Sequence, residues 1–315
     1  MKKSINYLIA LLSIALICKT SYAQNNNITI EITRHDDKSV DLTYKKLLPG
    51  SYYLELELND LTNCNSGDFK GVINNYTGVL LRLKPNNDKQ HINFSYSYRY
   101  MIGVPNPNID SSFTYILPFK NGKKFKIGES SHVGEKYLGH ERPINWKSYS
   151  LNSKNPDTVC SMRKGIVVKI IDDFENNETK GTFFTNKTNE ILIEHADGTY
   201  ARYINLKHKS MFVKLGQTVY PQTALGIMNE YGAENYRLSF QIYSYYYTNF
   251  KEKDKQLKEN ESSLKFIAPK FITQNGIVNI KSGQEYMAGF NETVMFKEFR
   301  KSEQKKYKKD PTLFN

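Results

Sequence analysis

Histidines that could hold a metal ion are few in this chain of 315 residues, and they are widely spaced. The six histidines include His140, His195 and His208, which follow no regular interval. A catalytic zinc ion needs at least three protein ligands that converge on one point. The spacing of these histidines therefore indicates no such site.

Two further side chains could take part in chemistry or recognition. Cys160 could act as a nucleophile, as thiols do in some cell-wall hydrolases. It lies in an apolar run with no recognisable paired histidine, which favours a buried structural thiol. Cys64 falls in a different expected domain, so a disulfide between the two and two free thiols both stay open. Trp146, the only tryptophan, could line a glycan groove or pack in the core.

The N-terminus predicts export. Lys2 and Lys3 precede an apolar run from Leu8 to Cys18, and Ser21-Tyr22-Ala23 has the small-residue ending of a secretory signal peptide. The apolar run is shorter than the ~20 residues that cross a bilayer. Ile17 precedes Cys18, where a lipid-attachment signal has a small residue. We expect residues 1–23 to be removed, leaving a protein that starts at Gln24 in the periplasm, on the cell surface or secreted.

The mature chain is basic. Without Lys2, Lys3 and Lys19 it has 41 basic and 32 acidic residues, a formal charge of +9. Such a surplus favours acidic partners such as anionic wall polymers or lipid headgroups, although it also serves solubility. No nucleic-acid motif accompanies it, and no later stretch is apolar enough to span a membrane. We therefore expect neither a nucleic-acid partner nor a transmembrane segment after signal cleavage.

Residues 24–112 are expected to form a β-sandwich-like domain. Apolar and polar residues alternate there in five short runs separated by turn residues, which predicts strands with one buried face. No cluster in this region is typical of a catalytic site. The apolar positions are Ile28, Ile30, Ile32; Val40, Leu42, Tyr44; Tyr52, Leu54, Leu56, Leu58; Val79, Leu81, Leu83; and Ile92, Phe94, Tyr96, Tyr98, Tyr100.

A second β domain is expected over residues 113–248, after the proline-rich linker at 104–108. Its strands include 166–171, 190–194, 200–205, 223–228 and 238–247, and Asp197-Gly198 predicts a tight hairpin turn. Residues 249–315 should form a C-terminal extension with a small β appendage and a basic tail. The charge-rich stretch 250–264 is either a loop or a short helix, and we expect the lysine-rich chain after Phe296 to fray.

The hairpin sequence carries a family resemblance. Residues 190–206 (EILIEHADGTYARYINL) resemble the apolar strand, His-x-Asp-Gly turn and Tyr-x-His-Leu strand of the lysostaphin/LytM-type zinc metallopeptidases, which have the duplicated hybrid motif fold. Residues 213–219 and 225–227 resemble the Val-x-x-Gly-x-x-Val and Ile-Gly steps that follow, and 159–167 resembles the strand before them. The resemblance covers about Tyr115 to Tyr247. It implies a mainly β chain whose central domain is a metallopeptidase-like β-sheet.

Several positions depart from what the family needs for zinc. By resemblance, an early His and Asp and the second His of a late His-x-His motif hold the metal, while the other His of that motif and the His of Tyr-x-His-Leu assist the attacking water. Here Arg237 and Ser239 replace the His-x-His pair, and Asn205 replaces the third of these histidines. Asn152 occupies the position of the metal-binding Asp. The nearest candidate for the first His is His140, 12 residues before Asn152 (152 − 140).

These replacements predict a degenerate family member with no catalytic residues, no bound metal and no cofactor. We expect its former groove to bind peptidoglycan or a partner cell-wall hydrolase. Arg237, Asn205 and Ser239 would contact the ligand, and the guanidinium would pair with a carboxylate. A buried ion pair between Arg237 and Glu194 is the structural alternative. Two other functions stay open: an active metalloendopeptidase that cleaves peptidoglycan peptide bonds with an unconventional zinc site, and a structural or adhesion module of the envelope.

Overall fold

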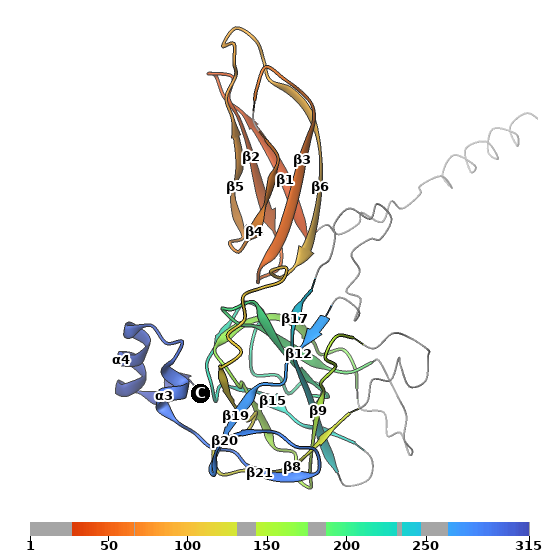
Figure 1. The fold of residues 1–315 in the computed structure, drawn as a ribbon, viewed down its shortest axis with the longest axis vertical. Helices are drawn as coiled ribbons and strands as arrows, with labels where there is room; N and C mark the ends of the chain where they lie inside the picture. The colour runs from red at the N-terminus through yellow and green to blue at the C-terminus, as the bar shows by residue number, and fades with distance from the viewer. Residues whose placement is uncertain are drawn as a thin grey trace, which may run out of the picture.

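The computed structural model describes residues 27–65, 67–130, 143–175, 187–231, 235–246 and 264–314. The regular elements of the described chain are mostly β-strands, which confirms the predicted fold class. Two bodies follow one another along the chain (Figure 1): an upper one with β1 to β6 and a lower one with β7 to β21. The expected signal peptide and His140 lie outside the described residues, as does nearly all of the charge-rich stretch 250–264.

The N-terminal body consists of two three-stranded antiparallel sheets. One has the order β1-β2-β5 (Ile28–Arg34, Val40–Lys46, Thr77–Leu83) and the other β4-β3-β6 (Phe69–Ile73, Tyr52–Thr62, Asn93–Ile102). Most of the alternating apolar residues bury one face of each sheet in a shared core that includes Ile28, Leu42, Leu54, Leu83 and Ile92, each without measurable exposure. Ile32 and Val79 are exposed instead, at 41% and 58%, and Leu80 is buried in β5. Strand β4 is an element that the alternation of the sequence did not reveal.

The second body is organised around one large sheet. Its order is β14-β11-β12-β13-β17-β9-β8-β21, and β16 and β18 also pair with β17. The bounds are β8 Lys124–Glu129, β9 Tyr149–Ser153, β11 Gly165–Ile171, β12 Glu190–Glu194, β13 Thr199–Ile204, β14 Thr218–Val219, β16 Asn229–Glu230, β17 Tyr236–Tyr245, β18 Leu264–Phe266 and β21 Gln284–Met287.

Two smaller sheets adjoin the large one. Strand β10 (Thr158–Cys160) pairs with β15 (Ala224–Ile227), and β7 (Thr114–Ile116) and β20 (Gly276–Asn279) flank β19 (Lys270–Thr273). One core, which includes Phe119, Leu151, Phe240 and Phe271, joins these sheets to the large sheet. The central strands and the C-terminal strands therefore share one hydrophobic core.

The C-terminal segment is more ordered than the sequence predicts, so the expectation that the tail frays after Phe296 was wrong. Helix α3 (Glu292–Phe296), helix α4 (Lys301–Lys309) and the 3₁₀ turn Pro311–Phe314 follow one another along the side of the lower body (Figure 1). Met295, Phe299 and Phe314 form a small buried cluster against Tyr220. The lysines suggested a solvated tail, but these aromatic residues dock it.

The two bodies meet at an aromatic interface. Met101 and Tyr53 of the upper body pack in one cluster with Tyr200, Tyr243 and other residues of the large sheet. The backbone N–H of Ser51 also donates to Glu194 Oε2 at 2.7 Å. The upper body therefore makes both apolar and hydrogen-bonded contacts with the sheet.

Candidate functional site

Strand β17 places the candidate residues on one face of the large sheet. Leu238 and Phe240 are fully buried in the core, whereas the alternate residues Arg237 and Ser239 are partly exposed. Residues two apart on a strand share a face. Arg237 and Ser239 therefore lie on the sheet face opposite the core, as the sequence predicts.

Neighbouring strands add polar residues to this face. In the antiparallel register, Arg237 lies opposite Asn152 of β9, and Ser239 lies opposite Ser150. On the outer side of β9, Lys126 of β8 lies opposite Asn152. These positions form a polar surface across three strands, which we call the 237 face.

Arg237 is held by two contacts. Its Nε donates to Asn152 Oδ1 at 2.8 Å, and its guanidinium carbon lies 3.6 Å from the centre of the Tyr231 ring. The amide and the ring fix the plane of the guanidinium. No hydrogen bond of Nη1 or Nη2 is found within the described ranges, so the outer edge of the guanidinium keeps its donors for another group.

Asn205 lies beside Arg237 but serves the backbone. It adopts a left-handed conformation (φ 74°), and its Nδ2 donates to the carbonyl oxygen of Arg237 at 2.8 Å. Its own carbonyl accepts from the backbone N–H of Asn229 at 3.0 Å. The structure thus brings Asn152, Asn205, Arg237 and Ser239 together on adjoining strands and loops, as predicted.

Asn229 belongs to the same cluster, although sequence reasoning missed it. It lies opposite Arg237 in the β16–β17 pair, and its Oδ1 is buried with no hydrogen-bond partner among the described residues. Buried side-chain oxygens are rarely left unpaired. A short, irregular sequence surrounds Asn229, so no periodic pattern marked it.

The residues at the expected ligand positions do not fit a zinc ion. Asn152 offers an amide and Ser239 a hydroxyl, where zinc prefers carboxylate, imidazole or thiolate. The amide oxygen of Asn152 already accepts a hydrogen bond from Arg237, whose permanent positive charge would repel a cation. In the part of the chain that the structure describes, no group of three or more His, Cys, Asp or Glu side chains could hold a metal.

The structural alternative, an ion pair between Arg237 and Glu194, is not present among the described residues. Glu194 is buried at the interface between the two bodies, where its Oε2 accepts from the N–H of Ser51. It also faces Lys46, a buried lysine whose pKa is lowered by desolvation despite the nearby carboxylate. Glu194 therefore serves the interface and not the 237 face.

The hairpin turn is structural. His195 N–H donates to the Thr199 carbonyl, Gly198 has φ 79°, and His195 Nδ1 lies 2.9 Å from Thr199 Oγ1. Burial and then the nearby Arg163 lower the pKa of His195 well below its ordinary value, so the imidazole is neutral. Asp197-Gly198 forms the predicted turn, and His195 supports it.

Arg163 organises the end of this hairpin. Its side chain is 3% exposed and pairs with Glu298 at 2.7 Å and with Asp197 at 2.9 Å. Nη1 also donates to Tyr115 Oη at 2.9 Å. This network joins the hairpin turn, the first strand of the lower body and the C-terminal segment, and nothing in the local sequence of Arg163 foretold it.

The remaining candidates are structural or peripheral. Cys160 and Cys64 are free thiols, and burial raises the pKa of Cys160 to about 11, which disfavours the nucleophilic thiolate. His208 is only partly exposed, and its Nδ1 lies 3.4 Å from Asp172 Oδ1.

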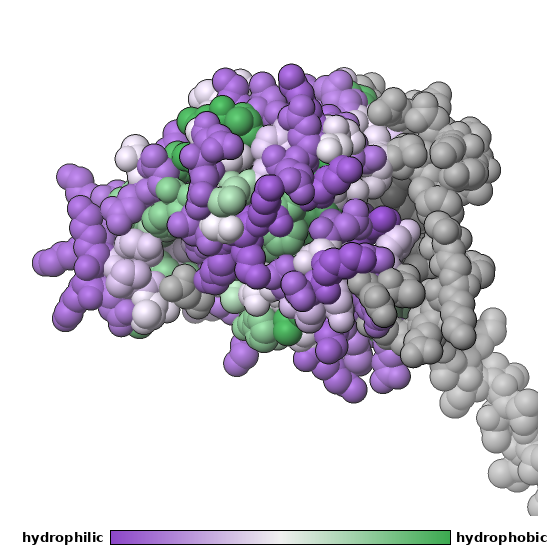
Figure 2. Space-filling model, turned by 90° about the horizontal axis from the view of Figure 1, so that it is seen from below, coloured by the Kyte–Doolittle hydropathy of each residue, from purple (hydrophilic) through white to green (hydrophobic). Residues whose placement is uncertain are grey.

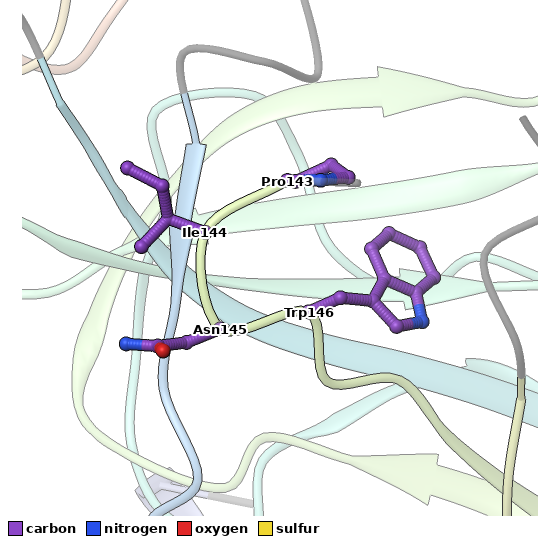
Figure 3. A pocket seen from close by; sticks show the side chains of 4 residues that line it. All are labelled: Pro143, Ile144, Asn145 and Trp146. Carbon is purple, nitrogen blue, oxygen red and sulfur yellow. The ribbon is translucent and has the colours of Figure 1, made fainter. Parts of the chain in front are cut away.

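Trp146 belongs to a shallow pocket away from the 237 face. It packs against Phe266 with ring centres 4.7 Å apart and donates through Nε1 to the Ser130 carbonyl. In that pocket Trp146 points away from Ile144 and Asn145 (Figure 3). The indole thus has core contacts on one side, as the packing alternative predicts.

Comparison with known proteins gives similarity in fold. No family model matches the sequence, and no curated protein matches it. Among solved structures, the deep-sea M23 metalloprotease pseudoalterin is 16% identical with a TM-score of 0.29, over 56% of this chain and 96% of that chain. The SpoIIQ–SpoIIIAH pore-forming complex matches at 22% identity and a TM-score of 0.26, over 42% of this chain and 85% of that one. Csd3 of Helicobacter pylori matches at 14% identity and a TM-score of 0.26, over 91% of this chain and 78% of that chain. At these identities and TM-scores the likenesses carry no argument about family or activity, and the resemblance to the LytM-type family is the one that residues 190–206 carry in the sequence.

Proposed function

We propose that this chain is an exported envelope protein whose LytM-type domain does not catalyse hydrolysis and instead binds peptidoglycan or a partner cell-wall hydrolase through the 237 face. The contact between Arg237 and Asn152 carries the proposal. At the position where the family resemblance implies a zinc-binding carboxylate, an amide oxygen accepts a hydrogen bond from a fixed cation.

The chemistry of the face suits binding better than hydrolysis. Hydrolysis by this family needs a metal-bound water and a base, and the expected positions offer an arginine, two amides and a hydroxyl. These groups are good hydrogen-bond partners for peptides and glycans. The positive formal charge of the mature chain, +9 (41 basic − 32 acidic residues), agrees with an acidic ligand.

The test uses the protein from Gln24 to the C-terminus, purified without refolding. Its zinc content is measured by elemental analysis, its activity by the loss of turbidity of purified sacculi, and its binding by sedimentation with sacculi and with cellulose particles as a control. We expect less than 0.1 zinc per chain, no lysis, and sedimentation with sacculi but not with cellulose.

Other outcomes identify other functions. One tightly bound zinc per chain together with lysis would establish an active metalloendopeptidase. Failure to sediment with sacculi, together with no effect on lysis by an added purified wall amidase, would contradict both binding roles. That result would favour the structural or adhesion module.

A further inference from the structure

The 237 face combines unused donors with an unused acceptor. Arg237 presents the Nη edge of its guanidinium, and Asn229 presents a buried Oδ1, which has no hydrogen-bond partner in the part of the chain that the structure describes. The two residues are direct partners in an antiparallel pair. Side chains of such partners start about 5 Å apart on the same face.

The surrounding contacts hold these two groups in place. Asn152 fixes Nε of Arg237 from one side, and the Tyr231 ring supports the guanidinium plane. Asn205 bonds to the backbone of both strands, accepting from Asn229 N–H and donating to the Arg237 carbonyl. The donor edge and the acceptor are therefore positioned before a ligand arrives, which lowers the entropy cost of binding.

A ligand that satisfies both groups must present an acceptor pair next to a donor. A carboxylate accepts two parallel hydrogen bonds from an arginine, and an N–H group satisfies an amide oxygen. The free C-terminus of a peptide has both, because its carboxylate is one residue away from its last amide N–H. An internal peptide bond has the N–H but only a neutral carbonyl.

We propose that the Arg237–Asn229 pair recognises the free carboxyl terminus of a peptide, with the carboxylate on the guanidinium and the last amide N–H on Asn229 Oδ1. This inference rests on the proposed binding function and specifies its ligand. It assigns the 237 face to chain ends, in contrast to the uncut peptide bonds on which a peptidase of this fold must act.

The test compares two ligands that differ only in this feature. N-acetyl-Ala-Ala as the free acid and as the C-terminal amide, each made from L- and from D-alanine, are titrated into the protein by isothermal calorimetry at low salt. We expect the acid to bind at least tenfold more tightly than the amide, since charged hydrogen bonds to the arginine are lost in the amide.

Variants identify the residues. Arg237→Gln should weaken binding of the acid about ten- to a hundredfold and leave the weak binding of the amide unchanged. Asn229→Asp should also abolish binding of the acid, because its carboxylate would pair with Arg237 and repel the ligand. Lys305→Gln is the matched control: it removes an exposed cation of α4, outside the 237 face, and should change affinity less than threefold.

The outcomes separate this inference from the proposed function. Equal affinity for acid and amide, or an equal loss in Arg237→Gln and Lys305→Gln, would overturn the inference. If sacculi still sediment with both variants, the binding function stands without it. If the free acid binds as expected but the wild-type protein neither sediments with sacculi nor changes lysis by the amidase, the recognition of chain ends stands. The envelope ligand is then a different peptide.

Discussion

The ion pair between Arg163 and Glu298 should be a main support of the lower body. Arg163 is 3% exposed and Glu298 is 16% exposed. Glu298 accepts two hydrogen bonds from Arg163, at 3.0 Å from Nε and 2.7 Å from Nη2. Glu298→Gln keeps the shape of the side chain but removes its charge and one of the two acceptors.

The magnitude follows from these contacts. A hydrogen bond to a charged group contributes about 1.5–3 kcal/mol, and breaking a buried pair from one side costs about 3–5 kcal/mol. Asp197 remains 2.9 Å from Arg163 and Gln can still accept one bond, so the loss should fall below the second range. We expect Glu298→Gln to lower the free energy of unfolding by about 1.5–3 kcal/mol.

Trp146 provides the assay, because it is the only tryptophan and packs against Phe266 of the large sheet. Urea unfolding followed by its fluorescence reports on the large sheet at its aromatic interface with the upper body. Glu292→Gln, at an exposed position of α3, is the control and should stay within 0.5 kcal/mol of wild type. Trypsin cleavage within α4 should also become faster in Glu298→Gln alone. A Glu298→Gln variant as stable as the control would refute the role of this pair.

Three other results are expected. Burial depresses the pKa of His195, so below about pH 6.5 the unfolded chain binds a proton that the native chain does not. The free energy of unfolding should therefore fall as pH is lowered from 7 to 5. The urea midpoint of His195→Gln should depend less on pH than that of the wild type. In the protein that starts at Gln24, a thiol reagent at pH 8 should label Cys64 rapidly and Cys160 only after denaturation. Peptide mass mapping identifies the labelled cysteine, and rapid labelling of Cys160 in the native protein would contradict its burial. Intact mass of protein recovered from envelopes should match a chain that starts at Gln24, and a mass for residues 1–315 or for an acylated Cys18 would disprove signal cleavage.

The sequence predicted those parts of the fold whose cause is local. Alternation of apolar residues located β1, β2 and β3, and Asp197-Gly198 located the hairpin turn, because each signal lies within a few residues. Strand β4 has the sequence FKGVI, which is too short and irregular for such a pattern. It becomes a strand because β3 offers a pairing edge on that side.

The candidate site was predicted in position but not in its contacts. Family spacing placed Asn152 and Arg237, and the strand register brings them opposite each other. The bond between them, the ring of Tyr231 and the unpaired oxygen of Asn229 depend on three separate strands or loops. Docking of the basic tail was missed for the same reason, since its partners Arg163 and Tyr220 are distant in the sequence.

Charge alone does not distinguish the 237 face from the rest of the surface. The end of the molecule away from the upper body is mostly hydrophilic, with separate apolar patches among the charged groups (Figure 2). Lysines of the lower body also pair with acids, as Lys123 does with Asp157 and Lys124 with Glu285. In the described ranges no helix is long and apolar enough to cross a membrane.

The parallel pairing of β7 with β19 has a consequence for the order in which the molecule is made. Tyr115 lies next to Phe271 in this pair, and Tyr286 of β21 lies next to Phe125 of β8. A chain that emerges from its N-terminus can complete the upper body early, because all partners of β1 to β6 lie within that segment. The lower body can be completed only when almost the entire chain has been synthesised. Until then β7 lacks its partner β19, and β8 lacks its partner β21. Such long-range closure slows folding and exposes edges to wrong partners, so the interval before completion is when this protein most needs a chaperone.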